Sequence, residues 1–214
     1  MFLTASILQF PVPAKLSRPS TDRDAEGFLE SLIGVFYPNS EPVGRFELVE
    51  ALTVPAPYST LLAHNRHMTV TVEAFHHDTV EVQVLRSQRQ GDTYSREIIL
   101  RTQRLGHVVQ YGIVRLHLHR IADGPKREIL KERKPLGRVL IEHQVLREIE
   151  LFDLWRIQCG SVLSQLFSVH PKTVTYGRTA MIHCNGEPAI ELLEIVQPAS
   201  DQALSPSKNS PGNR

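Results

Sequence analysis

Three charged residues lie inside segments whose alternating pattern predicts β-strands, and each faces the side that carries apolar neighbours. They are Arg96, Arg178 and Glu194. Because successive strand residues point to opposite faces, Arg96 shares its face with Ile98 and Leu100. A charged side chain is seldom buried without a partner. Two guanidinium groups and one carboxylate among aliphatic side chains therefore predict a pocket for a small anionic ligand.

The same charges have a structural interpretation. A strand arginine that faces apolar neighbours can pair with a glutamate and fix the fold without touching a ligand. Glu194 could be that partner for either arginine. The sequence alone leaves both interpretations open for Arg96 and for Arg178.

Composition limits the classes of protein to consider. The 214 residues are 41% hydrophobic, which is enough for one sizeable core, and we expect a single domain. Lys and Arg number 24 against 23 Asp and Glu, so a net charge of +1 gives no electrostatic reason to expect nucleic acid or a membrane as partner. Cys159 and Cys184 are too few for a disulfide scaffold, which favours a reducing, cytoplasmic location. The oligomeric state is not predicted.

The two ends of the chain differ from its middle. Residues 1–20 are an N-terminal extension that is apolar at its start but lacks the basic residues of a signal peptide and the length of a membrane span. Residues 21–198 hold the expected domain. Residues 199–214 are rich in Pro, Ser and Asn and predict a disordered tail.

Periodicity within the domain predicts an α+β fold with an antiparallel sheet. Helical spacing of apolar residues predicts a helix over 24–36, and prolines favour two short helices at 125–130 and 135–143. Partial alternation favours a strand over 147–157. Six further strands are expected as three hairpins, over residues 68–85, 94–118 and 173–196. The last hairpin turns at Asn185-Gly186, the pair most favoured in a two-residue type I′ turn.

Five short motifs occur in a characteristic order after an upstream His-Met-Thr at 67–69. They are R-E-I-I-L from Arg96, K-P-L-G-R from Lys134, Y-G-R from Tyr176, the N-G-E-P turn and L-E-I-V-Q-P from Leu193. Over roughly residues 60–198 this order resembles the chorismate pyruvate-lyase family. Members of that family fold as one α+β domain with a six-stranded antiparallel sheet and helices that cover the ligand site.

The resemblance implies an enzyme, a carbon-oxygen lyase that converts chorismate to 4-hydroxybenzoate and pyruvate with no metal or organic cofactor. It implies that Arg96 holds the ring carboxylate, that Glu194 lies at the ring hydroxyl and that both are catalytic. The backbone amide of Leu136 would help to bind the carboxylate, and Met68 would pack against the ring. Arg178 would take the enolpyruvyl carboxylate. The hydroxybenzoate would feed ubiquinone or phenolic-lipid synthesis.

Some of these assignments stay open. One extra residue separates Pro188 from Glu194 relative to shorter family members, so Glu191 remains a weaker candidate for the same role. Glu194 could act as a general base or could only orient the ring hydroxyl. His117 and His119 share a strand face, but no third ligand is spaced to complete a metal site, and we expect none.

Two other functions compete with the lyase. The same fold serves as the effector-binding half of certain bacterial transcription regulators, so a non-catalytic sensor of small aromatic carboxylates is the main alternative. No basic recognition helix precedes Met68, which counts against a sensor with its own DNA-binding half. A related enzyme that makes the 3-hydroxy isomer is the third possibility.

Overall fold

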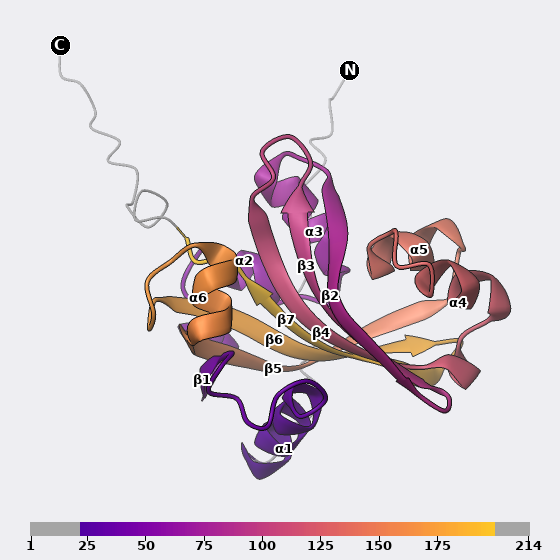
Figure 1. Cartoon of the computed structure of the whole chain (residues 1–214), viewed down its shortest axis with the longest axis horizontal. Helices are drawn as coiled ribbons and strands as arrows, with labels where there is room; N and C mark the ends of the chain where they lie inside the picture. Colours follow the sequence, from indigo (N-terminus) through magenta and orange to yellow (C-terminus); the bar gives the residue numbers. More distant parts are fainter. Residues whose placement is uncertain (1–21, 200–214) are drawn as a thin grey trace, which may run out of the picture.

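A seven-stranded antiparallel sheet is the centre of the fold (Figure 1). The computed structural model describes residues 22–199, so the expected extension over 1–20 and the tail beyond Ala199 lie outside the described residues. The strand order is β1-β5-β6-β7-β4-β3-β2. The strands are β1 (Gly44–Val49), β2 (Val80–Gln90), β3 (Thr93–Thr102), β4 (Val108–His117), β5 (Arg147–Cys159), β6 (Val174–Cys184) and β7 (Glu187–Val196). The predicted α+β antiparallel class is confirmed, whereas the six-stranded sheet that the family resemblance implies is wrong, because the sheet has seven strands.

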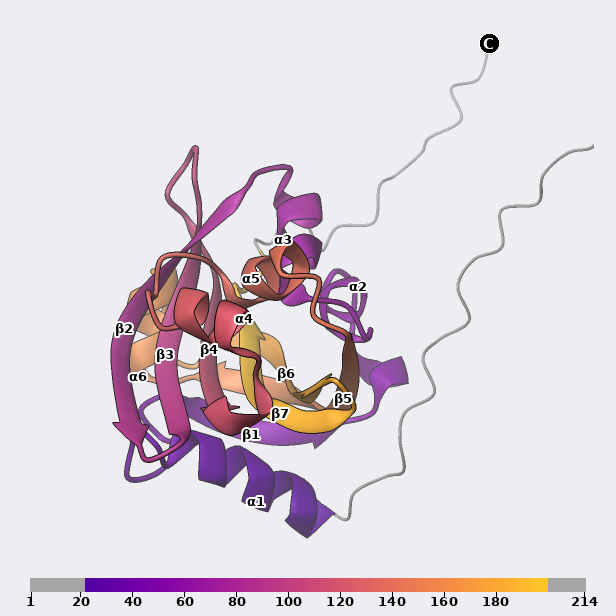
Figure 2. The ribbon, with the colours of Figure 1, turned by 90° about the vertical axis from the view of Figure 1, so that its right-hand side faces the viewer.

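Helices cover both faces of this sheet, and the two faces differ. α1 (Asp22–Ile33) and α6 (Ser161–Phe167) pack with apolar strand residues such as Ile99 and Ile113 on the outer face. The inner face is covered by α2 (Tyr58–Leu62), α3 (Met68–His76), α4 (Asp123–Ile129) and α5 (Leu136–Glu142). Figure 2 shows α1 on one side of the curved sheet and α3 and α5 on the other. Two 3-10 turns complete the elements, at Ala51–Thr53 and Leu118–Arg120. Within residues 22–199, no helix is both long and apolar enough to cross a membrane.

Most of the sequence-based element predictions are confirmed. The predicted helix at 24–36 is α1, and the segment at 147–157 is a strand, β5. β3 pairs with β4 and β6 pairs with β7, as the second and third hairpins require. Asn185 and Gly186 both have positive φ, 54° and 84°, as a type I′ turn demands. The predicted short helices after Pro125 and Pro135 are α4 and α5.

The first predicted hairpin is wrong, because residues 68–76 form helix α3 and not a strand. Their β-branched residues suggested an alternating strand, but Met68 and Val72 are four residues apart and lie on one buried helical face, at 2% and 0% exposure. Val70, between them, is 47% exposed. Packing of that apolar stripe onto the sheet outweighs the weak local preference of the β-branched residues. β2 therefore pairs with β3.

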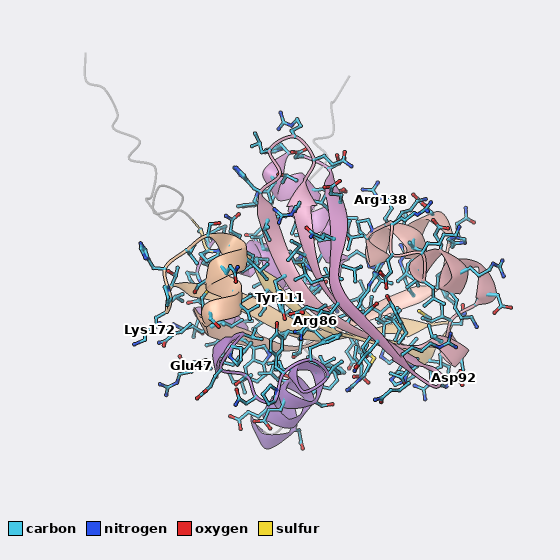
Figure 3. The ribbon with its side chains drawn as sticks, in the orientation of Figure 1. Glu47, Arg86, Asp92, Tyr111, Arg138 and Lys172 are labelled. Atoms are coloured by element: carbon cyan, nitrogen blue, oxygen red, sulfur yellow. The ribbon has the colours of Figure 1, made fainter. Side chains whose placement is uncertain are left out.

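Adjacent residues of β3 carry opposite charges to opposite faces of the sheet. Arg96 faces inward, whereas Glu97 lies on the outer face and is fully partnered. One carboxylate oxygen of Glu97 accepts hydrogen bonds from the hydroxyls of Tyr37 and Tyr111, and the other accepts one from Arg86 Nε at 2.7 Å. Tyr111 and Arg86, which both bond Glu97, are labelled in Figure 3. This cluster fixes β3 against β4 and the segment after α1.

Candidate functional site

A cavity lies on the inner face of the sheet, between the strands and the first turns of α3 and α5. The centre of a water molecule can move through about 40 Å³ of it. That is room for a few waters at about 10–15 Å³ each. A ring-sized ligand therefore needs α3 and α5 to move outward. The sequence-predicted residues all line this one cavity: Arg96, Arg178, Glu194, Leu136 and Met68.

Arg96 is a buried cation of the cavity with unsatisfied hydrogen-bond donors. Its side chain is 1% exposed, and its Nε and Nη1 have no hydrogen-bond partner among residues 22–199. Burial lowers the pKa of the guanidinium, while the Tyr94 hydroxyl and the Glu132 carboxylate partly oppose that shift. Arginine nevertheless stays protonated in proteins. The structure thus buries a cation that forms no ion pair with any described residue.

Tyr94 connects Arg96 to the helical cover. It faces the same side of β3 as Arg96, and its hydroxyl donates a hydrogen bond to Glu132 Oε1 at 2.5 Å. Burial and this carboxylate raise the pKa of Tyr94 to about 12, so the hydroxyl keeps its proton. Glu132 lies between α4 and α5 with a positive φ of 59°. The contact ties that connection to the strand that carries the unpaired cation.

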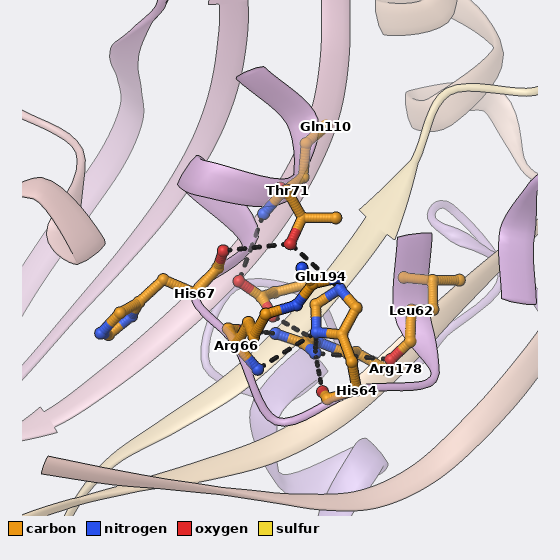
Figure 4. A network of polar contacts seen from close by, with 8 residues as sticks. All are labelled: Leu62, His64, Arg66, His67, Thr71, Gln110, Arg178 and Glu194. Atoms are coloured by element: carbon orange, nitrogen blue, oxygen red, sulfur yellow. Dashed lines mark hydrogen bonds and ion pairs between the residues drawn. The ribbon is translucent and has the colours of Figure 1, made fainter. Parts of the chain in front are cut away.

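Arg178, in contrast, is fully engaged. Its Nε donates to Glu194 Oε2 at 2.8 Å, its Nη1 to the carbonyl of His64 at 2.7 Å and its Nη2 to the carbonyl of Arg66 at 3.1 Å. Figure 4 shows these contacts converging on the segment between α2 and α3. The structural interpretation, a strand arginine paired with a glutamate, therefore describes the contacts of Arg178. As placed, Arg178 holds this segment against β6 and neutralises Glu194.

The two candidate glutamates lie on opposite faces of the sheet. Glu194 faces the cavity, where its second oxygen accepts a hydrogen bond from Gln110 Nε2 at 3.4 Å. Glu191 faces outward, forms an ion pair with Arg115 and contacts His117 Nε2 at 3.1 Å. The two glutamates are three positions apart on β7, and an odd offset along a strand gives opposite directions. Of the two, the structure brings only Glu194 to the cavity.

Leu136 and Met68 begin the two helices that cover the cavity. The first backbone bond of α5 runs from Val139 N–H to the carbonyl of Pro135, so the N–H of Leu136 is not used within the helix. Gly137 permits close approach of the two helices, because a Cβ there would lie 2.9 Å from Thr69 Oγ1.

Further along, an ion pair joins the same two helices over the cavity. Arg138 of α5 (labelled in Figure 3) donates to Glu73 of α3 at 2.5 Å. Glu73 also accepts a hydrogen bond from the backbone N–H of Val80, at 3.0 Å. The Glu73 carboxylate thus connects both covering helices to the start of β2.

Two polar residues of the cavity, His67 and Gln110, were not predicted from the sequence as site residues. His67 accepts a hydrogen bond from Arg147 Nε at 2.5 Å, and burial, Arg147 and Arg178 lower its pKa to about 4. Gln110 is 3% exposed on β4. A signal for it exists in the sequence, since it is the polar residue on the strand face that also carries Gly112 and Val114.

Comparisons with known proteins give structural neighbours only. No family model and no curated protein matches the chain. The effector domain of PhnF from Mycobacterium smegmatis is similar over 62% of this chain and 88% of its own, with 11% identity and a TM-score of 0.45. A structure of PhnF from the same organism is similar over 61% of this chain and 63% of its own, with 12% identity and a TM-score of 0.43.

A third solved structure belongs to the same class. The ligand-binding domain of a regulator assigned to the GntR family, from Bordetella bronchiseptica, matches 57% of this chain and 86% of its own at 15% identity and a TM-score of 0.42. Two of these three structures are described as an effector domain and a ligand-binding domain, and none of the three is described as a lyase. At such identities and TM-scores the likeness assigns no function to this chain.

Proposed function

We propose that this chain binds a small organic carboxylate in the inner-face cavity, with Arg96 as its anchor. The observation that carries the proposal is the guanidinium itself, which is 1% exposed, lines the cavity and has two nitrogens without a partner among the described residues. A buried donor left unpaired costs about 1–3 kcal/mol, and more when it is charged. A ligand carboxylate would supply charge-assisted hydrogen bonds to these nitrogens.

The finer function that we propose is elimination of pyruvate from chorismate, as the family resemblance implies. Its support is that five residues from α3, β3, α5, β6 and β7 line one cavity. The bond from the ring to the enolpyruvyl oxygen breaks, and a ring hydrogen is lost to the departing group, which leaves as pyruvate while the ring becomes 4-hydroxybenzoate. The products together hold the atoms of the substrate, so no co-reactant is needed.

In that reaction the protein's task is positioning and charge stabilisation. Arg96 and the N–H of Leu136, which is not used within α5, would hold the ring carboxylate, and Met68 would pack against the ring. Glu194, held by Arg178 and Gln110, would orient the ring hydroxyl or accept its neighbouring proton. Arg178 could reach the enolpyruvyl carboxylate only by exchanging contacts that it makes now.

A second candidate, non-catalytic sensing of an aromatic carboxylate, is favoured by one specific observation. Arg178 and Glu194 already form an ion pair, so Arg96 is the cavity arginine left without a carboxylate. Chorismate carries two carboxylates, whereas one unpaired guanidinium matches a monocarboxylate ligand better. Binding alone would satisfy Arg96.

A direct assay separates these functions. We expect purified protein with chorismate and a chelator to release pyruvate and 4-hydroxybenzoate, measured by a coupled pyruvate assay and by chromatography. Arg96→Ala should weaken binding by about 2–5 kcal/mol, the usual loss when one member of a desolvated charge pair is removed. Arg89→Ala is the matched control, because Arg89 is exposed at the end of β2.

The outcomes are distinct. Binding of chorismate or 4-hydroxybenzoate without turnover would replace the lyase with the sensor. Neither turnover nor binding of any small carboxylate, or unchanged affinity in Arg96→Ala, would remove the proposed site altogether.

A further inference from the structure

Gln110 is a second cavity residue with an unsatisfied polar atom. Its amide nitrogen donates to Glu194 Oε1 at 3.4 Å, while its side-chain oxygen is buried with no donor among residues 22–199. Glu194 is paired with the cation Arg178 and is therefore an ionised carboxylate, which only accepts hydrogen bonds. The Gln110 amide must turn its NH₂ group toward it, which leaves the carbonyl oxygen unpaired. Most buried side-chain polar atoms have a hydrogen-bond partner, so this unpaired oxygen calls for an explanation.

We propose that Gln110 determines ligand specificity, by accepting a hydrogen bond from an O–H or N–H group at the end of the ligand opposite its carboxylate. This inference rests on the proposed binding of a carboxylate at Arg96. It assigns to Gln110 a contact that the family resemblance implies for Glu194. The reason is that both oxygens of Glu194 already have partners, whereas the Gln110 oxygen has none.

Strand register places the two unsatisfied groups at opposite ends of the cavity floor. Gln110 of β4 pairs with Leu100 of β3, and Arg96 lies four residues before Leu100 on that strand. Four residues of a strand span about 13 Å between Cα atoms. Both side chains extend into the same cavity and shorten that span. A ligand that contacts both must carry its acid and its donor at opposite ends.

The floor between these groups is open because of a glycine. Gly112 pairs with Ile98, midway between the two register positions, and lines the cavity. A Cβ there would lie 3.1 Å from the carbonyl of Leu193 and 3.5 Å from Ile98 Cδ1, so a larger residue would fill this part of the floor. A flat six-membered ring fits over a surface without a side chain. Once α3 and α5 move outward, a ring acid with a hydroxyl or amino group in the para position, the ligand class of the proposed function, would present its two polar groups to Arg96 and Gln110.

A buried water could donate to the Gln110 side-chain oxygen in place of the ligand, and the cavity has room for one. A water can donate to Gln110 whether or not the ligand has a donor. If a water donates to Gln110, ligands with and without a hydroxyl should bind with similar affinity. If the ligand donates directly, the ligand with a hydroxyl should bind more tightly.

The test compares benzoate, 4-hydroxybenzoate and 4-methoxybenzoate by isothermal titration calorimetry with the full chain. We expect 4-hydroxybenzoate to bind about 10-fold tighter than benzoate, the equivalent of one net hydrogen bond. The methoxy compound, which has no donor, should bind no better than benzoate. Gln110→Leu should remove the preference for the hydroxyl, whereas Gln90→Leu, the same change at an exposed position, should keep it.

The results separate the role of Gln110 from carboxylate binding at Arg96. Benzoate and 4-hydroxybenzoate of equal affinity, or a preference that persists in Gln110→Leu, would overturn the role of Gln110 and leave carboxylate binding at Arg96 intact. Failure of all three compounds to bind would overturn both proposals. If Gln110→Leu does not fold, the comparison of the hydroxy and methoxy compounds on the unaltered protein still decides.

Discussion

Replacing Arg96 by methionine should stabilise the ligand-free protein while it abolishes carboxylate binding. A residue that only holds the fold together would do the reverse. Methionine keeps the unbranched aliphatic length of the arginine and removes the buried charge. The experiment therefore separates a guanidinium kept for a ligand from one kept for the fold.

The expected magnitude follows from the contacts of Arg96. Two nitrogens buried without partners cost about 1–3 kcal/mol each, or roughly 2–6 kcal/mol together. The variant loses the attraction of the guanidinium for Tyr94 and Glu132. This attraction is worth about 1 kcal/mol, because the Glu132 side chain is partly exposed. Some packing is also lost. A net gain of about 2 kcal/mol is expected, which should raise Tm by about 4–8 °C for a chain of this size.

The assay is urea unfolding of both proteins without ligand, with Arg178→Met as the matched control. Both arginines are 1% exposed and face the same cavity, but removal of Arg178 leaves Glu194 buried without its partner and should cost about 3–5 kcal/mol. Opposite signs for the two variants support the interpretation of Arg96. A loss of stability in Arg96→Met comparable to that in Arg178→Met would refute it.

Two further changes probe the polar groups around the cavity. The pKa of His67 is lowered from 6.5 to about 4, so the unfolded chain binds the proton more readily and stability falls as pH falls from 7 through that window. Between pH 7 and 5 this histidine accounts for about 2 kcal/mol of lost stability. His67→Gln should reduce the pH dependence of the free energy of unfolding, measured in urea, by that amount. An unchanged pH dependence would contradict the burial of a neutral His67. Glu194→Gln should lower turnover more than affinity if the carboxylate is a base, whereas Glu191→Gln, on the outer face, should leave kcat and ligand affinity unchanged in steady-state assays.

The residues around the cavity could be found from the sequence because strand alternation is a local property. Arg96, Arg178 and Glu194 each share a face with apolar neighbours, and that is visible without knowledge of strand order. Which charges pair is not local. Arg178 of β6 lies directly opposite Glu194 of β7, whereas β4 separates β7 from β3 and hence Glu194 from Arg96. Strand order therefore decides that Arg178 is neutralised and Arg96 is not.

Helix α3, which covers the cavity, could not be predicted from its local sequence. The Thr-Val-Thr-Val run at 69–72 favours a strand by propensity, and only its contacts with the sheet select a helix. β1 and α6 were missed because short elements carry little periodic signal and are fixed by the partners they meet, here β5 for β1.

The opposed directions of Arg96 and Glu97 constrain how the length of β3 can vary. An insertion or deletion of one residue before this pair, within the strand, would carry every later side chain to the other face. The cation would then arrive among the tyrosines that now satisfy Glu97, and the glutamate would enter the cavity beside Glu194. Both sides of the sheet would be disrupted by a single indel. Divergent relatives of this chain should therefore conserve the length of this segment even where the sequence around it has drifted.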